Sequence, residues 1–318
     1  MSIKRSLILV FCLLTVQTLH AEAVDRVFVT NEKSNDMTVI NSKTLEVETT
    51  VPVGNRPRGI HLSPDGKELY IAIGNENVIK VIDPRTLKII RQLHAGSDPE
   101  DFAVHPNGEI YISNEDAAKA SVFDPKTDRK LTEIDVGLEP EGVAISPDGK
   151  YVVVTSESSS LLHIIKVPEN TIIKNIVVGA RPRSAIFNRE GTLIYASSEI
   201  GGEIQEIDTR DFKIINSVKL GNDKAKPKDL RLSKDEKTLY VAGGRANAVF
   251  VLDAVNMKVL KNIPVGKRVW GLAMNRDKTR LFTTNGVSGT VSVIDTASNE
   301  VIKTIKVGSF PWGVVVDD

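Results

Sequence analysis

The sequence contains a single cysteine, Cys12, in a chain of 318 residues. Because it lies near the N-terminus, the rest of the chain can form no disulfide bond and offers no thiol nucleophile. The sequence also lacks a net charge, with 41 basic and 41 acidic side chains. This balance argues against nucleic acid or an anionic membrane as a partner, because both attract broad positive surfaces. Aromatic residues make up only 5% of the chain, and two of them are tryptophans, Trp270 and Trp312.

No apolar run is long enough to span a bilayer, which takes about 20 residues. A short run at 6–16 follows Lys4 and Arg5 and precedes the small-residue motif at 21–23, a pattern typical of an export signal. We therefore expect residues 1–23 to be a signal peptide cut after Ala23, with no membrane insertion of the mature chain; a retained anchor is the alternative. A lipid anchor is not expected, because the bulky Phe11 precedes Cys12. Export without disulfides fits a bacterial periplasm, where we place this protein.

Residues 24–318 repeat one pattern seven times. A glycine after a short apolar segment recurs at intervals of 41 to 45 residues, at Gly54, Gly96, Gly137, Gly179, Gly221, Gly266 and Gly308. Repeats of this period with several short strands each are the signature of a β-propeller. The sequence therefore predicts an all-β fold, a seven-bladed propeller with four antiparallel strands in each blade.

One repeat, 55–96, contains the elements of a complete blade. Short β-branched and aliphatic segments at 59–62, 69–73, 78–82 and 87–93 are separated by turns rich in Gly, Pro, Asp and Asn. Such segments favour antiparallel strands over helices. In the first turn, Pro64 presets φ and Gly66 accepts the positive φ that closes it.

The two ends of the mature chain complement each other. Residues 309–318 hold only a first strand, whereas residues 24–54 hold only the second, third and fourth strands. Joining them closes the ring with a composite blade and removes the exposed sheet edges that an open array would leave. We expect a monomer. The single domain at 24–318 then consists of units 55–96, 97–137, 138–179, 180–221, 222–266, 267–308, and 309–318 with 24–54.

The second strand of the repeat carries a family resemblance. It reads Phe-Val-Thr-Asn at 28–31, Tyr-Ile-Ser-Asn at 111–114, Tyr-Val-Ala-Gly at 240–243 and Phe-Thr-Thr-Asn at 282–285. These units resemble the YVTN β-propeller repeat across the whole mature chain. A signal peptide followed by seven such units is similar to the exported propellers associated with catabolism of alcohols that depends on pyrroloquinoline quinone (PQQ). The resemblance implies an accessory or binding role, and it supplies no catalytic residues.

The channel mouth is the place where the repeat can vary without disturbing the core. The position just before each expected inner strand reads Arg58, Glu100, Glu141, Arg183, Lys228, Trp270 and Trp312. Two positions earlier, the chain has Arg56, Asp98, Glu139, Arg181, Lys226, Arg268 and Phe310. Blades two and three thus form an acidic sector, blades four and five a basic sector, and blades six and seven supply both tryptophans.

These side chains suggest a ligand. Two indoles beside Arg and Lys could stack on a flat anionic or aromatic molecule, and PQQ or an aromatic acid fits that description. The alternatives are solvated turn residues with tryptophans that plug the channel, or a docking surface for a periplasmic or transporter protein. We therefore expect a small organic ligand or such a protein as the partner, and we assign no cofactor beyond PQQ as a candidate ligand.

A second set of rim residues follows the second strand. Four blades have a carboxylate there: Glu32, Glu115, Glu157 and Glu199. Several carboxylates around one opening could bind a cation, but we assign no metal ion to them. Histidines at 61, 94, 105 and 163 occupy different positions of the repeat and do not converge, and no hydrolase or phosphate-loop motif is present. We expect a binding protein with no catalytic residues; a lactonase-like metal-dependent hydrolase using Glu100 and Glu141 is the alternative.

Overall fold

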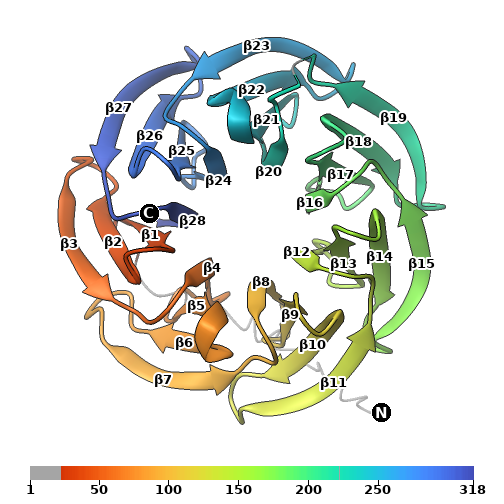
Figure 1. Cartoon of the computed structure of the whole chain (residues 1–318), viewed down its shortest axis with the longest axis horizontal. Helices are drawn as coiled ribbons and strands as arrows, with labels where there is room; N and C mark the ends of the chain where they lie inside the picture. The colour runs from red at the N-terminus through yellow and green to blue at the C-terminus, as the bar shows by residue number, and fades with distance from the viewer. Residues whose placement is uncertain (1–22, 222) are drawn as a thin grey trace, which may run out of the picture.

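Short β-branched and aliphatic segments form seven four-stranded antiparallel sheets arranged around a central axis (Figure 1). This computed structural model describes residues 23–221 and 223–318. The all-β, seven-bladed propeller predicted from the sequence is confirmed. The predicted signal peptide falls, except for Ala23, outside the described residues. Within them, no helix has the length and apolar character needed to cross a bilayer.

The strands of each blade follow one another from the axis outward. Blade one consists of β4 (Pro57–Leu62), β5 (Leu69–Ile73), β6 (Val78–Ile82) and β7 (Ile89–His94). Blade two consists of β8 (Pro99–Val104), β9 (Ile110–Asn114), β10 (Lys119–Asp124) and β11 (Arg129–Asp135). Blade three consists of β12 (Pro140–Ile145), β13 (Tyr151–Ser156), β14 (Leu161–Lys166) and β15 (Thr171–Val177). Blade four consists of β16 (Pro182–Phe187), β17 (Leu193–Ser198), β18 (Glu203–Asp208) and β19 (Lys213–Lys219). Blade five consists of β20 (Pro227–Leu232), β21 (Thr238–Gly243), β22 (Ala248–Asp253) and β23 (Lys258–Pro264). Blade six consists of β24 (Val269–Met274), β25 (Arg280–Asn285), β26 (Thr290–Asp295) and β27 (Glu300–Lys306).

Blade seven joins the two ends of the domain, as the sequence predicted. Its order is β28 (Pro311–Asp317), β1 (Arg26–Asn31), β2 (Asp36–Asn41) and β3 (Val47–Pro52). The last strand pairs antiparallel with the first, with Val29 opposite Val314 and Arg26 opposite Asp317. Val24 N donates to the Asp317 carboxylate at 3.3 Å. Closure of the ring therefore depends on strand pairing between residues nearly 300 positions apart.

The core lies between neighbouring blades. Second strands are almost wholly buried, as in β5, whereas outer strands such as β3 and β19 are mostly exposed. One apolar cluster joins Val27 and Val29 of blade seven to Phe282 and Val291 of blade six. Each sheet is thus covered on both faces by its neighbours, which explains the nearly continuous apolar sequence of second strands such as β5.

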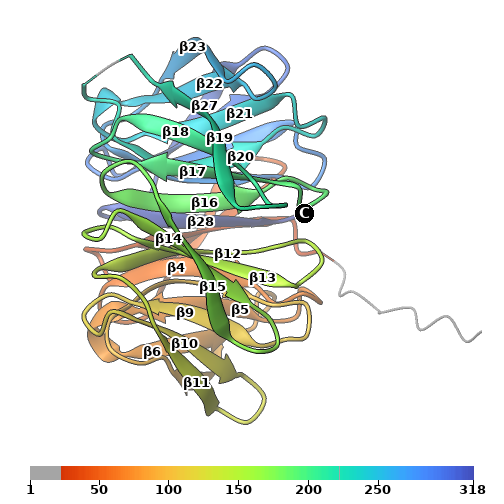
Figure 2. The same cartoon turned by 90° about the vertical axis from the view of Figure 1, so that its right-hand side faces the viewer.

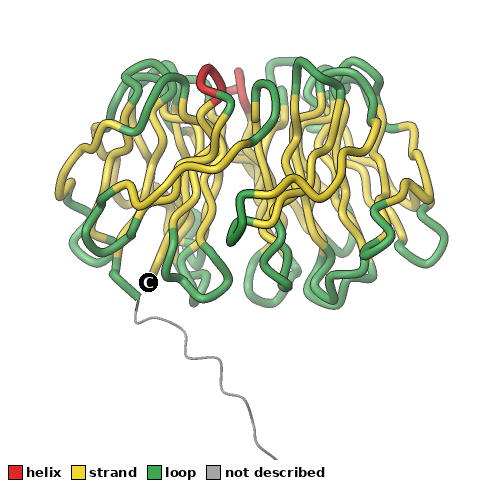
Figure 3. The backbone as a smooth tube through the Cα atoms, turned by 90° about the horizontal axis from the view of Figure 1, so that it is seen from below, coloured by secondary structure: helices red, strands yellow, loops and turns green. Residues whose placement is uncertain are grey.

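The ring has two distinct faces. Strands run from one face to the other, with loops on both (Figure 2). Two 3-10 turns, η1 (Gly74–Glu76) and η2 (Gly244–Ala246), follow second strands and mark the face predicted to carry the mouth (Figure 3). The C-terminus lies at the opposite face. On that face the turn 63–66 closes as expected, because Gly66 has a φ of +69° and its N–H donates to Ser63 O at 2.9 Å.

Candidate functional site at the channel mouth

The seven predicted mouth residues occupy one register of the ring. Each is the second residue of an inner strand, because these strands begin at the preceding proline, or at Val269 in blade six. The expectation that they precede the strands was therefore wrong, because each inner strand begins two residues earlier than predicted. The consequence is burial: Glu100 is 0% exposed, Glu141 2%, and Arg183 and Lys228 each 6%. Solvated turn residues are therefore excluded at these four positions, whereas a plug formed by the tryptophans stays an alternative.

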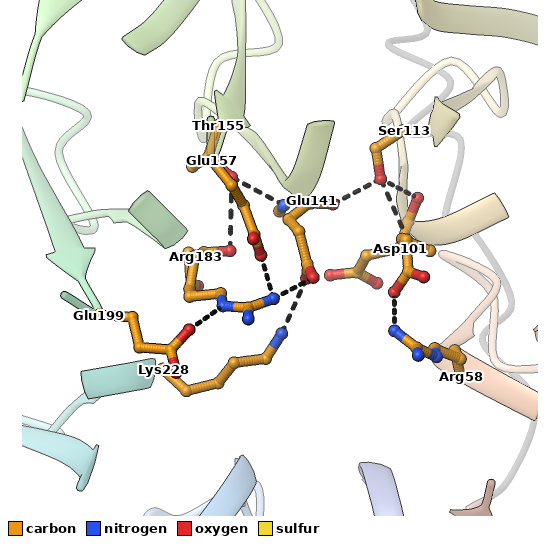
Figure 4. A network of polar contacts seen from close by, with 12 residues as sticks. Arg58, Asp101, Ser113, Glu141, Thr155, Glu157, Arg183, Glu199 and Lys228 are labelled. Carbon is orange, nitrogen blue, oxygen red and sulfur yellow. Dashed lines mark hydrogen bonds and ion pairs between the residues drawn. The ribbon is translucent and has the colours of Figure 1, made fainter. Parts of the chain in front are cut away.

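A hydroxyl group of the neighbouring blade holds the backbone at most of these positions. Thr30 Oγ1 donates to Arg58 O at 2.7 Å, and Ser197 Oγ donates to Lys228 O at 2.5 Å. Ser113 and Thr155 donate in the same way to the mouth residue of the following blade (Figure 4). Thr284 does so as well. This contact was not predicted from the sequence, although the hydroxyl residue at the third position of the second-strand motif carried the signal. This hydrogen bond fixes the backbone from which the mouth side chain extends.

The first ion-pair cluster surrounds Glu100, in blade two. Its two carboxylate oxygens accept from Arg56 Nη2, at 2.7 Å, and from Arg58 Nη1. Arg58 Nη2 also lies 3.1 Å from Glu32. Arg56 contacts Asp98 as well and lies 3.5 Å from Glu115. The cluster thus unites the mouth position with both predicted sets of rim residues.

The second ion-pair cluster surrounds Glu141, in blade three (Figure 4). Arg183 Nη1 contacts Glu141 and Glu157, while Arg183 Nε lies 2.6 Å from Glu199. Lys228 Nζ, two blades away, lies 2.8 Å from the other Glu141 oxygen. Arg181 completes the cluster through Glu157 at 2.5 Å and Glu199 at 3.5 Å. The expected acidic and basic sectors are therefore not separate charged surfaces, because their side chains neutralise one another.

Burial and neighbouring charges set the protonation of this network. Burial raises the pKa of Glu157, and the nearby Glu141 carboxylate raises it further. Burial opposes ionisation of Glu141 too, but Arg183 and Lys228 hold the pKa of Glu141 well below its usual range. Burial and Glu141 also raise the pKa of Glu100. Glu141 is thus the anion on which the second cluster depends, while Glu157 holds its proton more readily.

Carboxylates that could have bound a metal are engaged by arginine. Asp98, Glu100 and Glu115 place oxygen atoms within 4.8 Å of one another, yet Arg56 contacts all three residues. Glu141 is held by Arg183 and Lys228. The two residues considered for a metal-dependent hydrolase therefore serve as acceptors for guanidinium and ammonium groups.

The tryptophans of blades six and seven form the remaining wall. Their ring centroids lie 6.4 Å apart with a tilt of 55°. Lys228 Nζ lies 4.6 Å from the centroids of both rings, within the range of a cation–π contact. Neither Nε1 atom, both buried, has a hydrogen-bond partner among the described residues. The same is true of Arg58 Nε, so three buried N–H donors are unpaired at this side of the mouth.

A cavity of about 290 Å³ is lined by the three residues that carry these donors. Its lining includes both tryptophans, Phe310, Arg58 and Arg268, together with Lys33 over the Phe310 ring at 3.7 Å. Arg268 lies 4.7 Å from the centroid of Trp270, and no described carboxylate lies within 4.0 Å of its guanidinium. Burial is the main cause of the lowered pKa of Arg268. This is an aromatic cavity with cations in excess over its one carboxylate, that of Glu32.

The remaining predicted rim residues share a backbone feature. Seven residues in equivalent turns have a positive φ between 42° and 63°: Arg56, Asp98, Glu139, Arg181, Lys226, Arg268 and Phe310. Residues other than glycine seldom adopt this left-handed backbone conformation. Its recurrence at all seven positions therefore makes the turn a part of the repeat. Glu139 accepts from Ser158 Oγ at 2.5 Å and lies outside the second cluster. Among the described residues, Lys226 has no hydrogen bond or ion pair with a mouth residue; its carbonyl lies close to Gly244.

The raised pKa of Glu157 predicts a pH dependence. A carboxyl group whose pKa is higher in the folded than in the unfolded state binds more protons when folded, so stability falls as pH rises above its ordinary value of 4.5. We expect the urea midpoint to fall between about pH 5 and pH 8, and Glu157→Gln to flatten this slope. An equally steep slope in Glu157→Gln would show that Glu157 is ionised throughout.

Comparisons with known proteins identify relatives of this fold. The model of the choice-of-anchor I domain matches residues 74–285. A search of curated proteins gave no match. Among solved structures, hydrazine synthase from Kuenenia stuttgartiensis is similar with a TM-score of 0.79 and 19% identity, over 87% of this chain and 94% of that one.

Two further solved structures share the fold. A protein of unknown function from Desulfotomaculum acetoxidans has a TM-score of 0.80 at 16% identity, over 92% of this chain and 99% of that one. A proposed 6-phosphogluconolactonase from Bacteroides fragilis has a TM-score of 0.78 at 20% identity, over 93% and 99%. Since one fold hosts many activities, likeness at such identities shows the propeller alone.

Proposed function

The chain belongs to the choice-of-anchor I domain family, and on its propeller scaffold we propose a non-catalytic binding protein that holds a planar organic anion at the channel mouth. The ligand would occupy the cavity beside Trp270 and Trp312. The accessory role expected from the YVTN repeat resemblance and the periplasmic location expected from the N-terminal sequence are part of the same proposal.

The unpaired donors are the observation that carries this proposal. Trp270 Nε1, Trp312 Nε1 and Arg58 Nε are buried without acceptors among the described residues. Leaving a buried donor unpaired costs about 1–3 kcal/mol, so a protein seldom keeps three together without a compensating gain. Oxygen atoms of a ligand would supply the missing acceptors once the indole and guanidinium groups turn toward the cavity.

The surroundings of these donors favour a flat, negatively charged ligand. Indole and phenyl rings line the cavity and offer faces for stacking. Arg268, which has no ion-pair partner among the described residues, is positioned above Trp270 and can pair with a ligand carboxylate. PQQ, a planar molecule with several carboxylates, belongs to this class, and so do simpler aromatic acids.

The hydrolase alternative is less well supported by the geometry. A metal ion or general base at Glu100 or Glu141 would have to displace Arg56, Arg58, Arg183 or Lys228 from buried ion pairs. A protein-docking surface would not by itself account for three buried, unpaired N–H groups. Both alternatives are outcomes of the experiment below.

The proposal is tested by titrating the mature protein with PQQ, an aromatic monocarboxylate and the matching aromatic alcohol, following tryptophan fluorescence. Both tryptophans line the cavity, so bound ligand should change their emission. We expect saturable quenching by the acids and not by the alcohol. Arg268→Met should weaken binding about tenfold, because it removes a charge-assisted contact.

Arg129→Met is the matched control, because Arg129 is exposed on β11, the outermost strand of blade two, and blade two contributes no residue to the cavity. It should leave the affinity unchanged. Equal quenching by acid and alcohol, or an unchanged affinity in Arg268→Met, would contradict the anion site. Turnover of a lactone that a chelator abolishes would instead establish the hydrolase. Silence across the panel, with a transporter component co-purifying, would favour a docking role.

A further inference from the structure

The channel has a second basin on the face opposite the mouth. Its volume is about 690 Å³, and its walls come from inner strands and from the turns that follow them. Apolar side chains make up most of the wall, including Ile145, Ile186, Phe187, Met274 and Val316. The C-terminus marks this face in Figure 3, and Arg276 N donates to the Asp318 carboxylate at 2.8 Å. The basin is therefore separate from the cavity at the mouth.

The basin continues into the channel and ends there. It shares Ile60, His61, Phe187, Arg231 and Val314 with an inner cavity of about 270 Å³. That inner cavity is bounded at its far end by the buried mouth layer, which includes Glu141, Lys228 and Trp312. A ligand that enters from this face would thus meet apolar walls first and a closed ion-pair layer last.

Basic side chains predominate around the basin. Arg189, Arg231, Arg276 and Lys278 line it, against a single acidic residue, Glu236. Arg231 pairs with Asp229 at 2.6 Å. By contrast, Arg189 Nη2 donates to Lys234 O, and Lys278 Nζ donates to Leu232 O at 3.0 Å. Among the described residues, no carboxylate lies within 4.0 Å of the charged groups of Arg189, Arg276 or Lys278.

Lys278, which is half-buried, contributes to this excess of positive charge. Within the described part of the chain, its ammonium bonds only to backbone carbonyls, and burial is the main cause of its lowered pKa. A cationic group held in this way gains from an arriving anion, because the pair forms where solvent screens it less than at an open surface.

We propose that this basin is a second binding site, which takes a small organic anion with an apolar body, such as a medium-chain carboxylate. The carboxylate pairs with Arg276, Arg189 and Lys278 at the rim, and the apolar body lies along Ile186, Phe187 and Met274. The proposal does not depend on the function assigned to the mouth, because the two cavities have no lining residue in common.

The experiment compares three probes by calorimetry: octanoate, octylammonium and acetate. Octanoate should bind saturably, with octylammonium and acetate each at least about tenfold weaker, because one lacks the negative charge and the other the apolar body. Arg276→Met and Arg189→Met should each weaken octanoate binding roughly five- to tenfold. Both side chains are exposed, so the variants should fold.

Two variants separate this site from the mouth and from general charge effects. Arg129→Met and Arg268→Met should leave octanoate binding unchanged. Octanoate and octylammonium binding equally would show nonspecific apolar association, and no saturation by octanoate would show an empty basin; both overturn the proposal. A loss of octanoate binding in Arg268→Met would place the ligand at the mouth and overturn it as well.

Discussion

Glu141→Gln is expected to lower the free energy of unfolding by about 3–5 kcal/mol, the cost of removing one partner from a buried ion pair. The carboxylate is 2% exposed and accepts from Arg183 and from Lys228. Glutamine preserves the shape but removes the charge, so two buried cations lose their common anion. Arg183 retains Glu157 and Glu199, whereas no other described carboxylate lies within ion-pair distance of Lys228.

The matched control is Glu157→Gln. Both substitutions replace a buried glutamate of the same cluster by its amide, yet their pKa shifts point in opposite directions. Because Glu157 already favours the protonated form, its amide resembles the native state, and the loss should stay within about 1 kcal/mol at neutral pH. Equal losses in the two variants would show that the two carboxyl groups share the charge.

The reciprocal change tests whether the cost comes from unpaired cations. Adding Lys228→Met to Glu141→Gln removes the ammonium left without a partner, so the double variant should recover part of the loss. Urea unfolding, followed by refolding to verify reversibility, measures these differences. A double variant whose loss equals the sum of the two single losses would indicate that the pair is not coupled.

The blades could be predicted from the sequence because the information for each one is local. Recurrent turns, such as that ended by Gly66, and runs such as 69–73 specify strands within a single repeat. The composite blade also followed, since residues 309–318 supply the strand that 24–54 lack. The second-strand hydroxyls, as in Thr30 and Ser113, were equally visible but had no evident partner before the blades were placed side by side.

The pairing at the mouth could not be predicted in this way. Glu141 and Lys228 are 87 positions apart and belong to blades three and five, so their contact depends on the width of the channel. The strand start at Pro140 turns Glu141 from a loop residue into a buried one. Lining up equivalent positions therefore grouped residues that the structure places in one register of the ring, but it suggested charged sectors, where the structure has neutralised pairs.

Removal of residues 311–318 is expected to abolish cooperative folding. This segment forms β28, the inner strand of blade seven, and its loss leaves the edge of β1 unpaired. It also removes Trp312 and Val314, both buried, and the mouth contact that Thr284 makes with the Trp312 carbonyl. An open β1 edge promotes association of chains, so we expect aggregation and no thermal transition. A truncated monomer that unfolds near the wild-type midpoint would contradict this.

A circular permutant separates the loss of the strand from the loss of the closure. Val24 N contacts the Asp317 carboxylate at 3.3 Å, so a short linker can join residue 318 to residue 24, with new ends at Gly54 and Asn55. Every blade then has four consecutive strands, and all side chains are retained. We expect this permutant to fold and bind as the native chain does, but with lower stability, because strand exchange no longer ties blade seven to both ends of the domain. A permutant as stable as the native chain would assign the effect of truncation to the missing strand and its contacts alone, since closure would then contribute nothing.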